Sequence, residues 1–259
     1  MNKAEAMPYT PDRGVLSKVT RRLTQWRHAA PVTIAPERPI LTLSFDDCPK
    51  SAVNVGAPIM EELGVRGSYY VATGLLDQDT HMGRMANRDD VRALLESGHE
   101  IGAHTHSHLD CRKAEDEVLL DEVSKNLLEL DTITQGHPIE SFAFPYGETS
   151  FRAKLKLSRR FTNLRGVLSG INSGNCDRAQ LRAIELEGDP ASAEQALFAI
   201  RNLAEHPGWL ILFSHDVSDT PSSYGVTPSA LRSIIETAKD LGVEILTAGQ
   251  TAKKLGFVV

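Results

Sequence analysis

The stretch LTLSFDDCPK, residues 41–50, decides the fold, because an apolar run typical of a buried strand ends in two adjacent carboxylates, Asp46 and Asp47. Successive side chains of a strand point to opposite faces, so neighbouring acids can serve one site only where the strand ends and the chain turns. We therefore expect a reactive site at the end of this strand. On these ten residues alone, the alternative is a pair of solvated acids, which is the usual case for adjacent acids at a strand end.

A second stretch, GHEIGAHTHSHLD at residues 98–110, follows the same plan, with an apolar run that ends in residue types that bind metals. His104 and His108 are four residues apart, which places both on one face of a helix or of an extended chain. His106 joins them only if the segment is extended. Two imidazoles and the Asp47 carboxylate would give a three-ligand site with open positions, which is typical of catalytic rather than structural zinc. The alternative for the histidines alone is a hydrogen-bonded turn.

The composition indicates one globular domain. The chain has 259 residues, of which 41% are hydrophobic and 24% charged, and α/β barrels of this length fold as single domains. The net charge of −6 and the lack of a basic stripe argue against nucleic acid as a partner. Cys48, Cys111 and Cys176 cannot all pair within the chain, which favours a reducing compartment.

We expect an N-terminal extension at residues 1–38 followed by a domain at residues 39–259, because Pro31, Pro36 and Pro39 are typical of a linker between them. Within the extension, residues 15–29 have the pattern of a short basic amphipathic helix. Such a helix could lie on an anionic membrane surface. The alternatives are a helix that caps the barrel bottom or one that packs on a second copy in a homodimer. We find no secretory leader and no run near the roughly 20 apolar residues of a membrane span, so we expect a cytoplasmic protein.

From residue 40 onward, apolar runs alternate with helical patterns, which predicts a parallel sheet wrapped by helices. Strands are expected at residues 40–45, 67–72, 100–103, 141–144, 166–168, 183–186, 209–213 and 243–246, and helices at residues 53–63, 88–96, 115–133, 151–160, 191–204 and 228–241. With seven or eight strands, we expect the sheet to close into a barrel whose reactive groups gather at the carboxyl ends of the strands. Four of these ends carry reactive residues: Asp46 and Asp47, His104 to His108, Pro145 and Tyr146, and His215.

Four motifs together resemble those of the carbohydrate esterase family 4 (CE4) polysaccharide deacetylases, also called the NodB-homology domain. They are SFDD at residues 44–47, HTHSH at 104–108, FAFPYG at 142–147 and LFSHD at 212–216, and the resemblance covers residues 40–247. It implies an α/β fold of the distorted (β/α)7 barrel type. The short form without a leader is similar to the deacetylases of bacterial holdfast or exopolysaccharide synthesis.

The resemblance also implies a role for each motif. Asp47, His104 and His108 match the family's metal ligands, for Zn²⁺ or alternatively Co²⁺, Ni²⁺ or Mn²⁺. Asp46 matches the general base that takes a proton from the attacking water, and His215 matches the general acid that protonates the departing amine. In the segment Pro145, Tyr146 and Gly147, the backbone N–H of Tyr146 matches the donor to the oxyanion.

The sequence departs from the family pattern at three places. Cys48 stands where glycine is usual, so a thiol lies next to both acids. Ala143 stands where many members have an arginine that contacts the catalytic aspartate, and we name Arg182 as the residue that supplies this charge from another strand. The aspartate that usually accompanies the acid histidine is not evident, although Asp177 lies in the matching interval.

The expected substrate is an N-acetylglucosamine-containing polysaccharide or an undecaprenyl-linked oligosaccharide, met in the cytoplasm or at the inner face of the plasma membrane. Acetamide hydrolysis near neutral pH needs an activated water and a proton donor for nitrogen, and the motifs offer a candidate for each. One alternative is a deformylase or amidase that acts on a small amino-sugar or a cyclic imide. The other is a catalytically silent carbohydrate-binding barrel.

Overall fold

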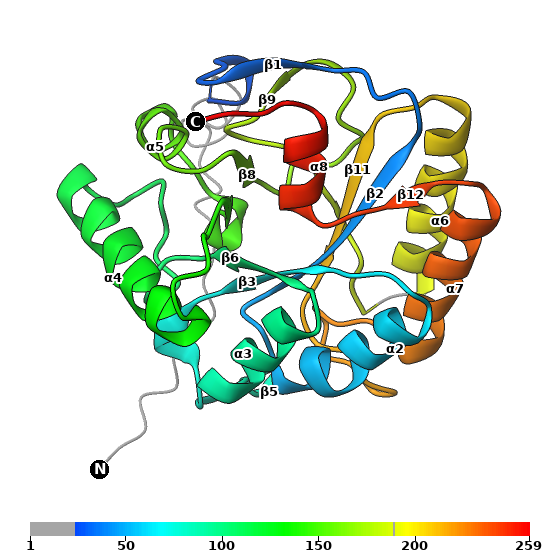
Figure 1. The fold of residues 1–259 in the computed structure, drawn as a ribbon, viewed down its shortest axis with the longest axis horizontal. Coiled ribbons are helices and arrows are strands. Elements are labelled where there is room, and N and C mark those ends of the chain that lie inside the picture. Colours follow the sequence, from blue (N-terminus) through cyan, green and yellow to red (C-terminus); the bar gives the residue numbers. More distant parts are fainter. Residues whose placement is uncertain (1–23, 189) are drawn as a thin grey trace.

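A computed structural model describes residues 24–188 and 190–259, which are organised around a curled parallel sheet (Figure 1). The strand order is β10 (Ile184–Glu185), β11 (Trp209–Ser214), β2 (Ile40–Asp46), β3 (Ser68–Val71), β6 (Glu100–Ala103), β7 (Ser141–Ala143) and β8 (Asn163–Arg165), and β12 (Glu244–Ile245) also pairs with β2. Every neighbouring pair in this sheet is parallel. The expected α/β architecture of the distorted (β/α) barrel type is therefore confirmed, although the sheet is curled rather than fully closed.

The two edges of the sheet, β8 and β10, are linked by the chain between them. The backbone N–H of Leu181 donates to the carbonyl of Leu164 at 2.8 Å, and the N–H of Gly166 donates to the carbonyl of Leu181 at 2.9 Å. Three residues after Leu181 the chain enters β10, which pairs with β11. The sheet consequently curls round on itself, which brings β2 and β8 to face one another across its interior.

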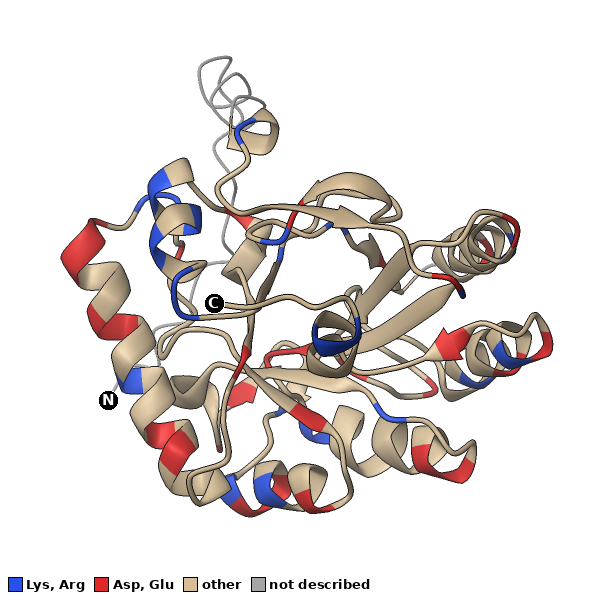
Figure 2. Cartoon of the chain, turned by 45° about the horizontal axis from the view of Figure 1, so that its top comes forward, with Lys and Arg blue, Asp and Glu red and all other residues tan. Residues whose placement is uncertain are grey.

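Helices surround this sheet (Figure 1), and many of the charged side chains lie on them (Figure 2). They are α2 (Ala57–Glu62, preceded by the π-helical turn η1, Ala52–Gly56), α3 (Arg88–Glu96), α4 (Asp116–Thr134), α5 (Phe151–Leu157), α6 (Pro190–Glu205) and α7 (Pro228–Asp240). The helix α7 begins as its sequence predicts, since the Thr227 hydroxyl accepts a hydrogen bond from the Ala230 N–H at 3.2 Å. All six predicted helices are present.

The last helix, α8 (Ala248–Lys254), was not expected, and it closes the end of the barrel opposite to the site. Its first residues lie at the amino ends of the strands, where the Ala248 N–H donates to the Ser68 hydroxyl and the Gly249 N–H donates to the Glu100 carboxylate. Its apolar side packs with Ile40 and Trp209. The C-terminal segment thus covers the barrel bottom, one of the places considered for the N-terminal helix.

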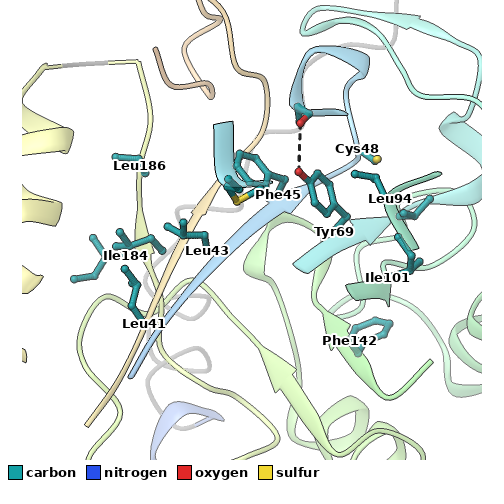
Figure 3. Close-up of a cluster of buried hydrophobic side chains, with 14 of the residues drawn as sticks. Leu41, Leu43, Phe45, Cys48, Tyr69, Leu94, Ile101, Phe142, Ile184 and Leu186 are labelled. Carbon is teal, nitrogen blue, oxygen red and sulfur yellow. Dashed lines mark hydrogen bonds between the residues drawn. The ribbon is translucent and has the colours of Figure 1, made fainter. Parts of the chain in front are cut away.

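The central strand β2 is buried along its whole length, and its successive side chains point alternately into two different environments. Leu41, Leu43 and Phe45 belong to the large apolar cluster of Figure 3. On the other side, the Thr42 hydroxyl accepts a hydrogen bond from the Trp209 indole at 2.9 Å. The period of two then turns Asp46, the last residue of the strand, toward the same interior as Thr42.

The folded body begins earlier than residue 39. Residues Pro31–Ile34 form β1, which pairs antiparallel with β9 (Gly174–Asp177), so the expected proline linker is in part a strand. Just before β1, the Asp177 carboxylate accepts the N–H groups of Ala29 and Ala30. Of the expected helix at residues 15–29, residues 15–23 lie outside the described residues, and residues 24–26 are helical.

The short hairpin of β4 (Asp79–Thr80) and β5 (Gly83–Arg84) and the 3₁₀ turns η2 (Thr73–Leu75) and η3 (Pro145–Gly147) lie in the connections between strands. Within residues 24–188 and 190–259, no helix is both long and apolar enough to cross a membrane.

Candidate active site

The carboxyl ends of β2, β6, β7 and β11 meet at one end of the barrel, as the motifs predict. Asp46 ends β2, His104 follows β6, and His215 follows β11. The backbone turns sharply after Asp46, because Asp47 and Cys48 both have φ of 60° and the Cys48 N–H donates to the Asp46 carbonyl at 2.7 Å. Positive φ is costly for residues other than glycine and often marks functional sites.

Asp47, His104 and His108 form one cluster. Their ligand-type atoms all lie within 4.8 Å of one another. The Asp47 Oδ1 atom is 3.6 Å from His104 Nε2 and 3.4 Å from His108 Nε2. This oxygen is buried and has no hydrogen-bond partner. A buried polar atom of this kind is costly unless a cation or a proton meets it, so the three residues fit a divalent metal ion.

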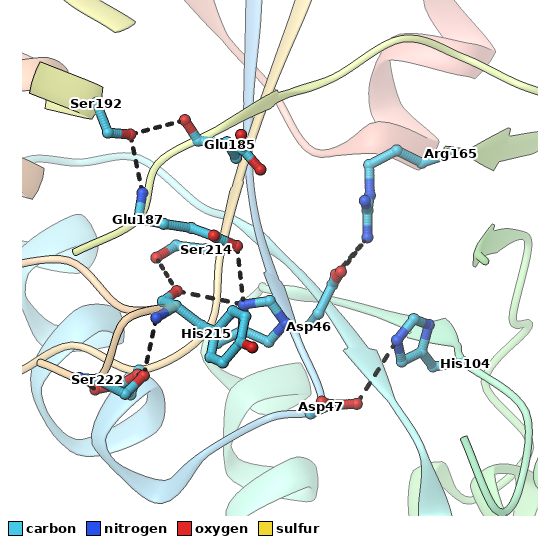
Figure 4. Close-up of polar contacts among 12 residues, drawn as sticks. Asp46, Asp47, His104, Arg165, Glu185, Glu187, Ser192, Ser214, His215 and Ser222 are labelled. Atoms are coloured by element: carbon cyan, nitrogen blue, oxygen red, sulfur yellow. Dashed lines mark hydrogen bonds and ion pairs between the residues drawn. The ribbon is translucent and has the colours of Figure 1, made fainter. Parts of the chain in front are cut away.

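The surroundings fix the imidazoles in a state that can bind a metal. His104 Nδ1 lies 2.8 Å from the Ala143 carbonyl, which can only accept, so Nδ1 carries the proton and Nε2 presents its lone pair toward Asp47 (Figure 4). Burial lowers the pKa of both His104 and His108 to about 4, so both rings are neutral near pH 7. Burial also raises the pKa of Asp47, which a nearby cation would oppose.

The loop that carries both histidines is held by α4. The Asn126 side-chain oxygen accepts the His104 N–H at 3.2 Å, and its nitrogen donates to the Val71 carbonyl at 2.9 Å, so the loop is joined to β3. His106 lies outside the cluster, because its Nδ1 atom is 3.0 Å from the Thr73 hydroxyl. The sequence did not identify Asn126 as a site residue, because it is only one polar residue among several in an amphipathic helix.

Asp46 is paired with a buried arginine. Arg165 Nη2 lies 2.5 Å from both Asp46 carboxylate oxygens, and the arginine side chain is fully buried (Figure 4). Burial alone would raise the pKa of Asp46, but the Arg165 charge and then the nearby imidazoles outweigh it, and the net shift is downward. The expectation for Arg182 was wrong, since its guanidinium donates to the Ser169 carbonyl at 3.1 Å instead.

His215 lies on the other flank of Asp46, near enough for its charge to contribute to lowering the Asp46 pKa. Its Nδ1 atom is 3.3 Å from the Tyr224 carbonyl, so the proton on Nδ1 is held there and Nε2 is left for chemistry. The Glu187 carboxylate is 3.8 Å from Nδ1. Asp177 is not its partner, because it forms a buried ion pair with Lys154 at 2.7 Å.

The segment Pro145, Tyr146 and Gly147 forms the turn η3 beside the metal cluster. Tyr146 has φ of 57°, and its ring stands edge-on to the His108 ring at 4.2 Å between centroids. A side chain at Gly147 would come within 2.1 Å of Val167, so this turn requires glycine. The turn therefore places the Tyr146 backbone next to one of the candidate ligands.

Cys48 is buried, and its environment argues against a reactive thiol. It belongs to the apolar cluster that includes Phe45 and Tyr69 (Figure 3). Burial, and then the neighbouring carboxylates, raise the pKa of the Cys48 thiol above its usual range. The residue thus serves as a small core side chain.

The fold is similar to those of several solved structures. The chitin deacetylase of the fungal pathogen Colletotrichum lindemuthianum is 17% identical, with a TM-score of 0.64 over 86% of this chain and 92% of that one. A family 4 acetyl xylan esterase from Clostridium thermocellum, solved in complex with a cobalt ion, is 22% identical, with a TM-score of 0.61 over 85% and 93%. A CE4 family pseudoenzyme from Bacillus anthracis is 12% identical, with a TM-score of 0.59 over 85% and 68%.

These similarities define the class as the NodB-like fold of the CE4 deacetylases. The sequence comparison is more specific, since the family model described as polysaccharide deacetylase matches residues 33–162, half of the chain. The chain therefore belongs to the polysaccharide deacetylase family. No curated protein sequence matches the chain significantly.

Proposed function

We propose that this protein is a metal-dependent de-N-acetylase that hydrolyses the acetamido groups of N-acetylglucosamine units. The observation that carries the proposal is the convergence of Asp47, His104 and His108 around the buried, unpartnered Asp47 Oδ1 atom. We take Zn²⁺ as the ion, because two neutral imidazoles and one carboxylate are a ligand set typical of catalytic zinc. Such an ion, when bound, lowers the pKa of water and polarises a carbonyl.

Asp46 supplies the general base. In the proposed reaction, its carboxylate accepts a proton from the water whose oxygen attacks the acetamide carbonyl carbon. Arg165 keeps Asp46 ionised and holds its orientation, since it contacts both carboxylate oxygens. The backbone N–H of Tyr146 donates to the carbonyl oxygen as negative charge develops on it.

His215 supplies the general acid. Its Nδ1 atom is held by the Tyr224 carbonyl, so its protonated Nε2 can donate to the sugar nitrogen as the C–N bond breaks. The products are acetate and the free amine of the sugar. Burial, and then the neighbouring Glu185, raise the pKa of Glu187 to about 8, so its carboxyl group, 3.8 Å from His215 Nδ1, is a polar neighbour of the ring rather than a full counter-charge near pH 7.

The glycan is proposed to be a bacterial exopolysaccharide of the holdfast type, or its undecaprenyl-linked precursor at the inner face of the plasma membrane. The four sequence motifs and the deacetylases among the structural neighbours support this choice. The basic segment at residues 15–29 would then contact anionic lipid, which liposome sedimentation of wild-type and Arg21→Glu/Arg22→Glu protein at low salt would test. Self-association into a homodimer would be measured by light scattering.

The test is acetate release from N-acetylglucosamine oligomers by zinc-loaded protein, with Asp46→Asn and His215→Gln as variants. We expect each variant to lose about 10²-fold to 10⁴-fold in rate, the range for removal of a general acid or base. His106→Gln is the matched control, because His106 lies on the same loop but outside the cluster. Equal rates of acetate release by wild type and both variants would contradict the roles assigned to Asp46 and His215. No acetate from any of them would contradict the proposal and favour a silent barrel.

A further inference from the structure

The barrel interior beneath Asp46 contains three buried polar atoms that have no hydrogen-bond partner among the described residues. They are the Tyr70 hydroxyl, Asn163 Oδ1 and Arg165 Nε, and all three residues are fully buried. Such atoms are costly unless they are satisfied, and ordered internal water usually meets them. We infer that the interior binds ordered water at these three atoms and that this water helps to hold Arg165 against Asp46.

The strands direct the three side chains into one region. Asn163 and Arg165 are two residues apart on β8, so they point to the same side of the sheet. Arg165 reaches Asp46 at the end of β2, which identifies this side as the barrel interior (Figure 4). Tyr70 comes from β3, and its ring centroid is 5.2 Å from Arg165 Cζ. The tyrosine and the arginine therefore lie side by side inside the barrel.

The neighbours of these side chains in the sheet are small. Ala143 pairs with Arg165 in the register of β7 and β8, and Gly102 pairs with Tyr70 in that of β3 and β6. A side chain at Gly102 would come within 2.5 Å of the tyrosine ring. A water site needs polar partners and space between them, and the short side chains on β6 and β7 favour such space.

Other hydrogen bonds fix which atoms face the site. Both terminal nitrogens of Arg165 have partners, so Nε is the nitrogen that is left. Asn163 Nδ2 donates to the Ser141 hydroxyl at 2.8 Å, and this hydroxyl donates its own proton to the Glu100 carboxylate. Because the hydroxyl must accept from Asn163, the amide cannot be reversed. Oδ1 is therefore the amide atom without a partner.

The chemistry of the three atoms selects water rather than an ion. Arg165 Nε–H can only donate, Asn163 Oδ1 can only accept, and the Tyr70 hydroxyl can do either. Water can accept from the first atom and donate to the second. A cation would meet the positive guanidinium. An anion would face the Asn163 oxygen in a region where burial, and then the Glu100 carboxylate, already raise the pKa of Tyr70.

Water at Nε has a consequence for the active site. The guanidinium is a planar, rigid fork, so a hydrogen bond at Nε fixes the plane in which Nη2 meets both oxygens of Asp46. Tyr70 is then a positioning residue, which acts through water and Arg165. This effect on catalysis rests on the proposed function, whereas the water site itself does not.

The test is NMR of ¹⁵N-labelled, zinc-loaded protein, with the Arg165 Nε–H signal assigned through side-chain correlations. In the wild type we expect a rotating-frame Overhauser effect between this proton and water, whose sign separates bound water from proton exchange. In Tyr70→Phe, which loses only the hydroxyl, the effect should weaken and the signal should shift. The rate constant kcat for acetate release should fall about threefold to tenfold, the equivalent of one hydrogen bond, with KM unchanged.

Tyr69→Phe is the matched control. Tyr69 is the preceding residue and is also fully buried, but its hydroxyl donates to the Ala52 carbonyl at 3.3 Å, on the other side of β3. The control should leave both the Arg165 signal and kcat as in the wild type. A merely structural effect of losing a buried hydroxyl would appear in both variants.

The wild-type measurement needs no variant, and absence of the Overhauser effect there would overturn the water site. A signal that changes with chloride concentration would show that an anion takes the place of water. An Arg165 signal in Tyr70→Phe identical to that of the wild type, or equal kcat for the two tyrosine variants, would overturn the role of Tyr70. Failure of the proposed function gives a different result, since the wild type would then release no acetate although the NMR results are as expected.

Discussion

Arg165→Met provides a sensitive test of how the base is held. In the wild type, Arg165 is fully buried and contacts both oxygens of Asp46, which is only 5% exposed. Methionine leaves the carboxylate buried without its counter-charge. Loss of one partner of a buried ion pair costs about 3–5 kcal/mol in the free energy of unfolding. We expect a loss of that size at pH 7, measured by urea unfolding of the metal-free protein.

The matched control is Arg182→Met, whose guanidinium is bonded to a backbone carbonyl at an exposed position and should change stability by less than about 0.5 kcal/mol. The double variant Asp46→Asn/Arg165→Met removes both charges and should regain much of the loss. Similar stability of the two arginine variants, or no recovery in the double variant, would refute the reasoning.

The pH dependence of this loss has a definite sign. In the wild type the Asp46 pKa in the folded state is lowered below 3.8, so its contribution stabilises the fold above that pH and is lost as the pH falls further. In Arg165→Met, burial raises the Asp46 pKa, so the carboxylate destabilises the fold above its unfolded pKa of 3.8. The stability difference between variant and wild type should therefore shrink as the pH falls toward 4.

Three further outcomes are expected. Metal-free protein should become less stable as the pH falls from 6.5 toward 4. His104 and His108 have pKa values of about 4 in the folded protein and 6.5 in the unfolded chain, so the unfolded chain takes up protons first. A melting temperature that does not change across this pH window would contradict this prediction. The Cys48 thiol should resist a thiol reagent in the folded protein and react only in urea, because burial raises its pKa. Rapid labelling of Cys48 in the native protein, located by peptide mapping, would disprove this prediction. Lys154→Met should lower the free energy of unfolding by about 3–5 kcal/mol, because it leaves the Asp177 carboxylate buried beside β1 without its partner. Chemical denaturation that shows no such loss would exclude an anchoring role for this ion pair.

The sequence predicted those parts of the fold that are marked by apolar runs. The strands β2, β6 and β11 were found at nearly their observed bounds, and their polar ends gave Asp46, Asp47 and the two clustered histidines. Strand β8 was placed three residues late. Its own residues include the polar Asn163 and Arg165, which are both buried, so the apolar pattern does not mark it.

The partner of Asp46 was missed for the same reason. Arg165 lay outside the predicted strand, so its direction into the barrel could not be foreseen, and Arg182 was chosen from the segment that closes the sheet instead. Glu187 did have a signal, because it directly follows the predicted strand at residues 183–186, just as Asp46 directly follows the predicted strand at residues 40–45. The first acid after each strand of such a barrel is therefore worth considering for the site.

The measurement that tests the central claim most directly is the stoichiometry of zinc binding, measured by equilibrium dialysis of wild type, Asp47→Ala and His106→Ala. The account predicts one ion for each wild-type chain and each His106→Ala chain, and none for Asp47→Ala at the same free zinc concentration. Since His106 is bonded to Thr73 on the same loop, it controls for general effects of histidine removal. Wild type that binds no zinc, or Asp47→Ala that binds as much as wild type, would contradict the claim that Asp47, His104 and His108 form the metal site.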